Sequence, residues 1–145
     1  MIELDPQDAV ALLASVPLGR IGFSHRALPV IRPVNHLVDD GHIVIRTHAG
    51  SALLRNPPVP EVVVYEADLI DLRSRSGWSV MVTGRASQVT APLEVARYQR
   101  LLRPWIDMDM DQVVRISMEI VTGYRIGRPG GPGPDWTPPD EASWP

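Results

Sequence analysis

The sequence of 145 residues contains no cysteine and no lysine, and all 14 of its basic residues are arginine. Without cysteine the chain has no disulfides, thiolate metal sites, iron–sulfur clusters or cysteine nucleophile, which fits a reducing compartment. Without lysine it cannot use Schiff-base or P-loop lysine chemistry. A bound phosphate must therefore be held by arginine, by hydroxyl groups or by backbone N–H groups.

Long hydrophobic runs and an excess of positive charge are also absent. No run of 18 apolar residues is present, and the first residues are acidic, so we expect neither a membrane span nor a secretory signal and predict a cytoplasmic protein. The formal net charge of −3 gives no indication of binding to nucleic acid or to an anionic membrane. Hydrophobic residues at 44% and charged residues at 21% are typical of a globular domain.

The chain length predicts one domain with one core. Residues 129–145 are rich in proline and glycine and show neither strand nor helix periodicity. We therefore expect a folded domain over residues 1–128 and a tail over residues 129–145. Because the tail contains Trp136 and Trp144, it either extends into solvent or docks on the domain or a partner subunit through these side chains.

Hydrophobic periodicity predicts two short helices, over residues 6–16 and from residue 92 to about residue 102. Asp5 and Pro6 supply the N-cap and the first helical position of the first helix. The residues expected to face the core are Ala9, Leu12, Leu13 and Val16 in the first helix, and Leu93, Ala96, Tyr98 and Leu101 in the second.

Runs rich in β-branched residues predict six strands, over residues 20–24, 28–38, 42–48, 61–71, 79–90 and 113–126. Connections of hairpin length favour an antiparallel sheet. Closing this sheet into a barrel would remove its exposed edges. The sequence therefore predicts a mainly β fold, a six-stranded antiparallel barrel with two short helices.

Arg32 and Pro33 interrupt the apolar run of the second predicted strand. Proline removes a hydrogen-bond donor from a sheet, so it is expected at an edge, at a bulge, or where a planar ligand approaches the backbone. The third predicted strand ends with Arg46 and Thr47, and Ser51 follows. A cation and hydroxyl groups before a helical turn suit a phosphate, although the same residues also fit a capped turn between a strand and a helix.

No metal site and no hydrolase site are indicated. The histidines His25, His36, His42 and His48 do not form an HExxH motif or a pair four residues apart on a helix. No serine lies in a GxSxG motif. We therefore expect no bound metal.

The chain resembles the pyridoxamine 5′-phosphate oxidase-like FMN-binding split-barrel proteins, specifically their small actinobacterial group, in GRIGFS, LPVIRPVNHLVDDGHIVIRTHAGS, GWSVMVTGRA and VRISMEIVTGYRI. The resemblance covers roughly residues 5–128, and GWSVMVTGRA is its most specific part. It implies a six-stranded split barrel that forms a homodimer, with a cofactor in each of two clefts between the subunits.

The resemblance also implies the residues that bind the cofactor. Arg32, Pro33, Val34 and Asn35 would lie along the isoalloxazine and ribityl chain; Arg46, Thr47 and Ser51 would hold the phosphate; Trp78, Ser79 and Arg85 would lie near the cleft, with Trp78 reaching toward the partner's flavin. The sequence departs from the family at Ala52, where lysine is usual, and at Tyr124, where an arginine pair often begins.

These features lead to the hypothesis of an FMN-binding flavoprotein, an oxidoreductase or reductase with its flavin at the dimer interface. Two alternatives stay open, a deazaflavin-dependent reductase and a split-barrel binding module without a cofactor. No catalytic residue is assigned. Tyr124, His36 and His48 are the candidates for proton transfer within the expected cleft.

Overall fold

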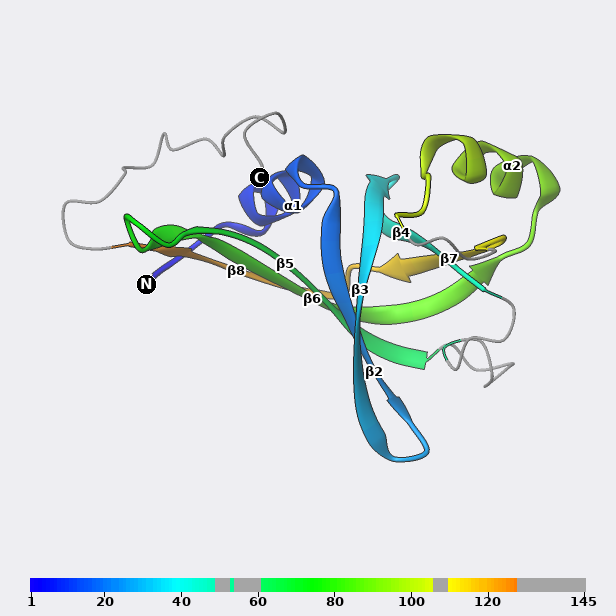
Figure 1. Ribbon diagram of the computed structural model, residues 1–145, viewed down its shortest axis with the longest axis horizontal. Coiled ribbons are helices and arrows are strands. Elements are labelled where there is room, and N and C mark those ends of the chain that lie inside the picture. Colours follow the sequence, from blue (N-terminus) through cyan, green and yellow to red (C-terminus); the bar gives the residue numbers. More distant parts are fainter. Residues whose placement is uncertain (49–52, 54–60, 106–109, 128–145) are drawn as a thin grey trace.

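The computed structural model describes residues 1–48, 53, 61–105 and 110–127. Eight strands form one antiparallel sheet in the order β1-β8-β6-β5-β2-β3-β4-β7, and a further pairing between β6 and β7 closes six of them into a barrel (Figure 1). The predicted mainly β fold, a six-stranded antiparallel barrel with two helices, is therefore confirmed. None of the helices in the described ranges is long and apolar enough to cross a membrane.

The helices and strands follow the chain in this order: β1 (Ile2–Glu3), α1 (Pro6–Ser15), β2 (Leu18–His25), β3 (Leu28–Asp39), β4 (His42–Thr47), β5 (Glu61–Asp71), β6 (Ser76–Val89), α2 (Pro92–Leu101), β7 (Gln112–Ser117) and β8 (Ile120–Ile126). The prediction of a single strand over residues 113–126 was wrong. The chain turns at Met118 and Glu119, where the Glu119 N–H donates to the carbonyl oxygen of Thr83 at 3.1 Å.

Strand β6 pairs with two different strands along one of its edges. It pairs with β8 from Gly77 to Thr83 and then with β7 from Ala86 to Val89, while β5 occupies its other edge. This change of partner splits the sheet. It also allows β7 to return along β6 and close the barrel, whereas β8 and β1 extend the sheet beyond it.

Gly84 lies at the point where β6 changes partner, and no larger residue fits there. A Cβ atom at position 84 would lie 1.6 Å from the carbonyl oxygen of Ser117. The N–H of Arg85 donates to the Ser117 hydroxyl oxygen at 2.9 Å. Glycine therefore permits the close contact between β6 and the end of β7.

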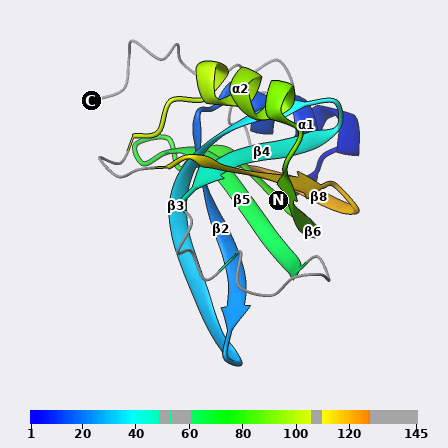
Figure 2. The same cartoon turned by 90° about the vertical axis from the view of Figure 1, so that its right-hand side faces the viewer.

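Helix α1 covers one end of the barrel. As predicted, it begins with Pro6 after Asp5, although the Asp5 side chain makes no capping hydrogen bond. Its Ala9 and Leu13 are fully buried. Gly123 of β8 makes room for this contact, since a Cβ atom there would lie 2.8 Å from the Cβ of Ala9. Figure 2 shows both helices on the same side of the strands.

Helix α2 packs on a separate apolar cluster made of Val44, Val89, Tyr98, Leu102 and Val113, with Leu37 and Val95 beside it. The prediction of its core-facing side was correct for Tyr98 and wrong for Leu93, Ala96 and Leu101, which are exposed. The orientation follows from Tyr98, whose hydroxyl group donates to Asp39 Oδ2 at 2.7 Å. This hydrogen bond and the burial of the ring turn Val95 and Leu102, rather than Leu93 and Leu101, toward the barrel.

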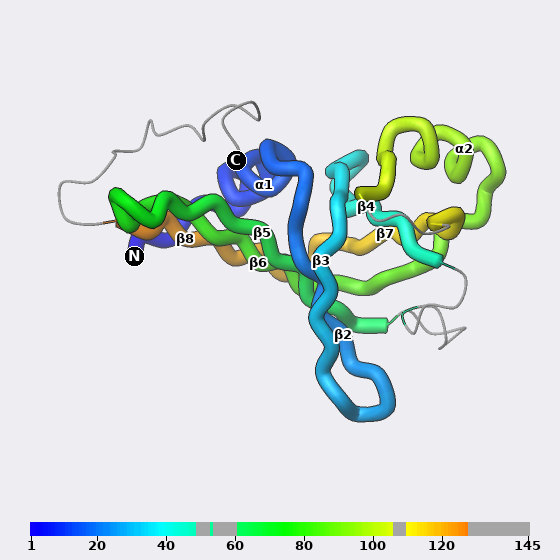
Figure 3. The backbone as a smooth tube through the Cα atoms, in the orientation of Figure 1, coloured from blue at the N-terminus to red at the C-terminus, as the bar shows by residue number. Residues whose placement is uncertain are grey.

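The β2–β3 hairpin projects away from the barrel (Figure 3). Strand β3 pairs with β2 from Leu28 to Asn35 but with β4 only from His36 to Asp39. Within the described residues, the first half of β3 therefore has an open edge. Pro33 lies on this half, which confirms that the proline marks a strand edge.

Replacing Gly84 by alanine should destabilise the fold by about 3 kcal/mol or more, because the backbone of β6 or β7 must shift to admit the new methyl group. Denaturant unfolding measures this loss. Gly41→Ala is the control: Gly41 has φ of +72° but no atom within 4 Å of the added Cβ, so only backbone strain of about 1 kcal/mol is expected. Equal losses of stability at the two positions would show that the close contact between β6 and the end of β7 does not require glycine at position 84.

Candidate functional site

The residues expected to bind a cofactor fall into two groups on the barrel. Residues 32–35 lie on β3, and Arg46 and Thr47 lie at the end of the adjacent strand β4. Ser79 and Arg85 lie on β6, which is separated from β3 by β5 and β2. The structure thus places the first group on two adjacent strands, with two strands between β3 and β6 in either direction around the barrel and only β7 between β4 and β6. Ser51 lies outside the described residues.

Arg32 and Pro33 are exposed on the open half of β3. The Arg32 guanidinium faces solvent, and its Nη1 makes a long contact of 3.4 Å to the carbonyl oxygen of Ile31. Val34, next along the strand, is half-buried. This edge offers the cation of Arg32 and the apolar side chains of Pro33 and Val34 to a ligand that lies along the strand.

Asn35 and Arg46 hold the backbone of the segment that follows α2. The Asn35 side-chain amide donates to the carbonyl oxygen of Arg103 at 2.7 Å. Arg46 donates through Nε to the carbonyl oxygen of Met110 at 2.6 Å, and through Nη1 to those of Leu102 at 2.9 Å and Gln99 at 3.3 Å. Three of the five guanidinium N–H groups therefore satisfy carbonyls at and beyond the end of the helix.

Only some of the polar groups of β3 and β4 are available to an elongated ligand with an anionic end. The side chains of Arg32 and Thr47 are accessible, whereas those of Asn35 and Arg46 are bound to the backbone. The sequence indicated the residue types correctly. It could not show that the side chains of Asn35 and Arg46 would donate hydrogen bonds to backbone carbonyls more than 50 residues away.

A buried pair is formed by His36 of β3 and Tyr65 of β5. The Tyr65 hydroxyl group is 2.5 Å from His36 Nδ1 and 3.1 Å from the carbonyl oxygen of Val34. His36 Nε2 lies 2.9 Å from the carbonyl oxygen of Leu13 in α1. Because a carbonyl only accepts hydrogen bonds, Nε2 carries a proton, and Nδ1 of the neutral ring accepts from Tyr65.

Both members of this pair are held neutral by their surroundings. Burial lowers the pKa of His36, against the opposing effect of its hydrogen bond to Leu13, and burial raises the pKa of Tyr65. His36 is only 5% exposed, so its ring lies in the interior and does not line an open cleft. His48 and Tyr124, the other candidates for proton transfer, are accessible to solvent.

Trp78 lies on the inward side of β6 and is 1% exposed. No acceptor for its indole N–H occurs in the described part of the chain. The side chain therefore belongs to the barrel core. To reach a flavin of a partner subunit, as the resemblance implied, it would have to leave that core.

Ser79 and Arg85 point away from the core. Residues directly opposite each other in antiparallel strands share one face, so the pairings of β6 define a surface that we call the outer sheet face. It spans β3, β2, β5, β6 and β8. Its exposed apolar side chains include Ile31, Val62, Ile70, Met81 and Ile120.

An ionic cluster of Arg20, Glu66 and Asp68 lies on the outer sheet face. Arg20 Nη1 is 2.8 Å from Glu66 Oε2 and 3.6 Å from Asp68 Oδ2. Burial, together with the hydrogen bond and the negative charge of Asp68, raises the pKa of Glu66 to about 7, although Arg20 acts in the opposite direction. The period-2 spacing of the two acidic residues signals a shared face, but the contact with Arg20 depends on the pairing of β2 with β5.

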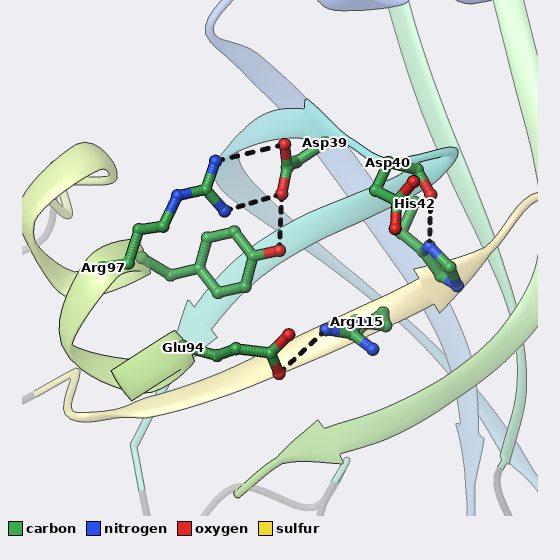
Figure 4. Close-up of polar contacts among 7 residues, drawn as sticks. Asp39, Asp40, His42, Glu94, Arg97 and Arg115 are labelled. Atoms are coloured by element: carbon green, nitrogen blue, oxygen red, sulfur yellow. Dashed lines mark hydrogen bonds and ion pairs between the residues drawn. The ribbon is translucent and has the colours of Figure 1, made fainter. Parts of the chain in front are cut away.

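A second charged cluster attaches α2 to the barrel (Figure 4). Arg97 donates to both carboxylate oxygens of Asp39, at 2.9 and 3.3 Å, and Arg115 of β7 contacts Glu94 at 3.3 Å. Hydrogen bonds from Arg97 and Tyr98 lower the pKa of Asp39 to about 2. Asp39 therefore stays ionised, and these contacts are structural. Across the described ranges, no three His, Asp or Glu side chains are placed to hold a metal ion.

Arg46→Ala should destabilise the protein by about 3 kcal/mol, because it leaves the carbonyls of Leu102 and Met110 without their charged donor. Urea unfolding of the protein without added ligand measures this effect. Arg100→Ala, which removes an exposed arginine of α2, is the control and should change stability by less than about 0.5 kcal/mol. Equal stabilities of the two variants would show that Arg46 does not hold the segment after α2.

Similarity to known proteins identifies the family of this chain. The family model for pyridoxamine 5′-phosphate oxidase matches residues 5–125. The Mycobacterium tuberculosis protein Rv0080 is 54% identical to this chain over 130 residues, which cover 87% of this chain and 86% of that protein.

Two solved structures are similar over most of the chain. A protein of Corynebacterium glutamicum is 35% identical, with a TM-score of 0.74 and coverage of 87% of this chain and 98% of the other. The FAD binding protein from Mycobacterium smegmatis is 30% identical, with a TM-score of 0.71 and coverage of 88% and 100%. The split barrel, the matched span and these relatives agree that the chain belongs to the pyridoxamine 5′-phosphate oxidase family of flavin-binding split barrels.

Proposed function

We propose that the chain is an FMN-binding oxidoreductase that works as a homodimer, with one flavin in each of two clefts between the subunits. Membership of a flavin-binding family supports the cofactor class, and the Mycobacterium smegmatis relative is an FAD binding protein. Members of this family are commonly dimeric. We further propose that the folded domain comprises residues 1–128 and that the protein is cytoplasmic.

The separation of the two groups of expected residues is the observation that carries the proposal. The open edge of β3, with Arg32 and Pro33, and the β6 positions Ser79 and Arg85 are too far apart in the sheet to hold one ring within one chain. Two strand spacings of about 5 Å separate β6 from β2 alone. In a two-fold dimer, the β3 edge of one subunit can face β6 of the other, and a single cleft then contains both groups.

The outer sheet face is the surface through which the second copy binds. Its exposed side chains include Ile31, Val62 and Met81, which are 67%, 56% and 45% exposed. Burying such side chains stabilises association by about 25 cal/mol per Å² of apolar surface. The face is continuous with the open edge of β3, because Pro33 lies directly opposite Arg20 on β2.

In this arrangement Pro33 and Val34 line the flat ring, and Arg32 and Thr47 supply a cation and a hydroxyl group for the ribityl phosphate. Ser51, which lies outside the described residues, adds a second hydroxyl group. Arg46 contributes its Nη2 group, because its Nε and Nη1 are bound to carbonyls. When bound, the flavin supplies hydride or electron transfer, and the protein orients it and excludes water.

The occupied side chains of Asn35 and Arg46 favour a second candidate function, a split-barrel binding module without a cofactor. Ala52 supplies no cation where the family usually has lysine. In this case the outer sheet face would serve association alone. Binding measurements with FMN separate the two candidates.

Arg32→Ala should weaken FMN binding by about ten- to a hundredfold, because one charge-assisted hydrogen bond to the phosphate is lost. Ala52→Lys should tighten it by adding a cation. Riboflavin, which lacks the phosphate, is the control ligand, and its affinity should respond little to either change. Fluorescence titration of both ligands measures these affinities.

Parallel shifts for FMN and riboflavin would contradict the assigned phosphate site. A chain that binds a deazaflavin but not FMN would be a deazaflavin-dependent reductase. A chain that binds neither ligand would be the binding module.

Met81→Glu should convert the dimer to a monomer, because it places a further carboxylate beside Glu66 at the centre of the outer sheet face. Leu93→Glu on α2 is the matched control, since Leu93 is 87% exposed and lies away from this face. Sedimentation velocity at micromolar concentration distinguishes the two states. If Leu93→Glu dissociates the dimer and Met81→Glu does not, the interface lies elsewhere.

A further inference from the structure

The cluster of Arg20, Glu66 and Asp68 carries more negative than positive charge. One guanidinium faces two carboxyl groups, at 2.8 and 3.6 Å. With both carboxyl groups ionised, the cluster therefore has a net charge of −1. The three side chains are half-buried to half-exposed in the single chain, where water screens this charge.

The neighbours of the cluster on the outer sheet face supply no second cation. Arg20 and Glu66 lie opposite each other on β2 and β5. On the next strands, Pro33 of β3 lies opposite Arg20, Met81 of β6 lies opposite Glu66, and Thr122 of β8 lies opposite Met81. Ser79 lies opposite Asp68, and Tyr124 lies beyond Ser79. None of these neighbours is an arginine or a histidine.

Other charged residues of the face are already paired. Arg85, which lies further along β6 and opposite Val62, contacts Glu119 at 3.5 Å. On the same face of β5, the next residues before Glu66 and after Asp68 are Val64 and Ile70. Among the residues that the structure describes, the excess negative charge therefore has uncharged neighbours.

A second copy that covers the outer sheet face would remove water from this cluster. Burying an uncompensated carboxylate is unfavourable, and a carboxyl group in that situation responds by binding a proton. Glu66 needs little help to do so, because its pKa is already about 7 in the single chain. One proton shared between Glu66 and Asp68 makes the cluster neutral.

We propose that the Glu66–Asp68 pair takes up a proton when the second copy covers the outer sheet face, so that the dimer is a proton-linked assembly. This inference rests on the homodimer proposed above. It adds a regulation of that interface by pH, with one proton-binding site in each subunit.

The direction of the pH dependence follows from linkage. Covering the face raises the pKa of Glu66 further, so the dimer binds protons more tightly than the monomer does. Below the monomer pKa both states are protonated and the dimer has its full stability. Above it, dimer formation must take protons from solution, and the dissociation constant rises with pH. A shift of one pKa unit at each of the two sites corresponds to about a hundredfold change in that constant.

Sedimentation equilibrium of the full chain between pH 5.5 and 9 tests the proposal. The dimer dissociation constant of the wild type should rise by about ten- to a hundredfold across this range. Glu66→Gln, a neutral replacement of similar shape, should give a tight dimer whose dissociation constant barely changes with pH. Glu94→Gln removes an ion-paired glutamate of α2 and should keep the wild-type pH dependence.

A wild-type dimer whose dissociation constant does not change with pH would overturn the proton uptake while leaving the homodimer intact. The same conclusion would follow if Glu66→Gln kept the wild-type pH dependence. A chain that stays monomeric at every pH and concentration would instead contradict the homodimer itself, and the proton uptake with it.

Discussion

The change of partner along β6 is the constraint on which the rest of the structure depends. Gly84 lets the strand leave β8 and pair with β7, because the carbonyl oxygen of Ser117 occupies the space of a Cβ atom. The pairing with β7 closes the barrel, and the two helices then cover one side of the strands. The outer sheet face carries the exposed apolar side chains on which the proposed dimer depends.

Local patterns in the sequence predicted most of the fold, and failures occurred where distant contacts decide. The helix that begins at Pro6 and five of the barrel strands follow from periodicity and turn residues. The last predicted strand was too long, because no glycine or proline marks the turn at Met118 and Glu119. The exposed side of α2 was mistaken because Tyr98 is bound to Asp39, a residue 59 positions earlier.

In the candidate site too, the sequence indicated the types of residue but not the distant residues that each of them contacts. Arg32 and Pro33, identified from sequence, are exposed on β3, and half-buried Thr47 lies on the adjacent strand β4. The sequence could not reveal that Arg46 binds carbonyls at and beyond the end of α2, because these acceptors lie more than 50 residues away in the chain. Trp78 and His36 were candidates for the cofactor site and for proton transfer, but both side chains are buried in the core. Glu66 and Asp68 form a cluster with Arg20 only after β2 and β5 have paired.

The central claim is that two copies of the chain hold the flavin between them. Sedimentation velocity of the protein with FMN, followed by protein absorbance and by the visible absorbance of the flavin, tests this claim directly. Across a dilution series that populates monomer and dimer, the account predicts that bound flavin sediments with the dimer and that the monomer carries none. Flavin that sediments with the monomer would contradict the account, because one chain would then contain the complete site.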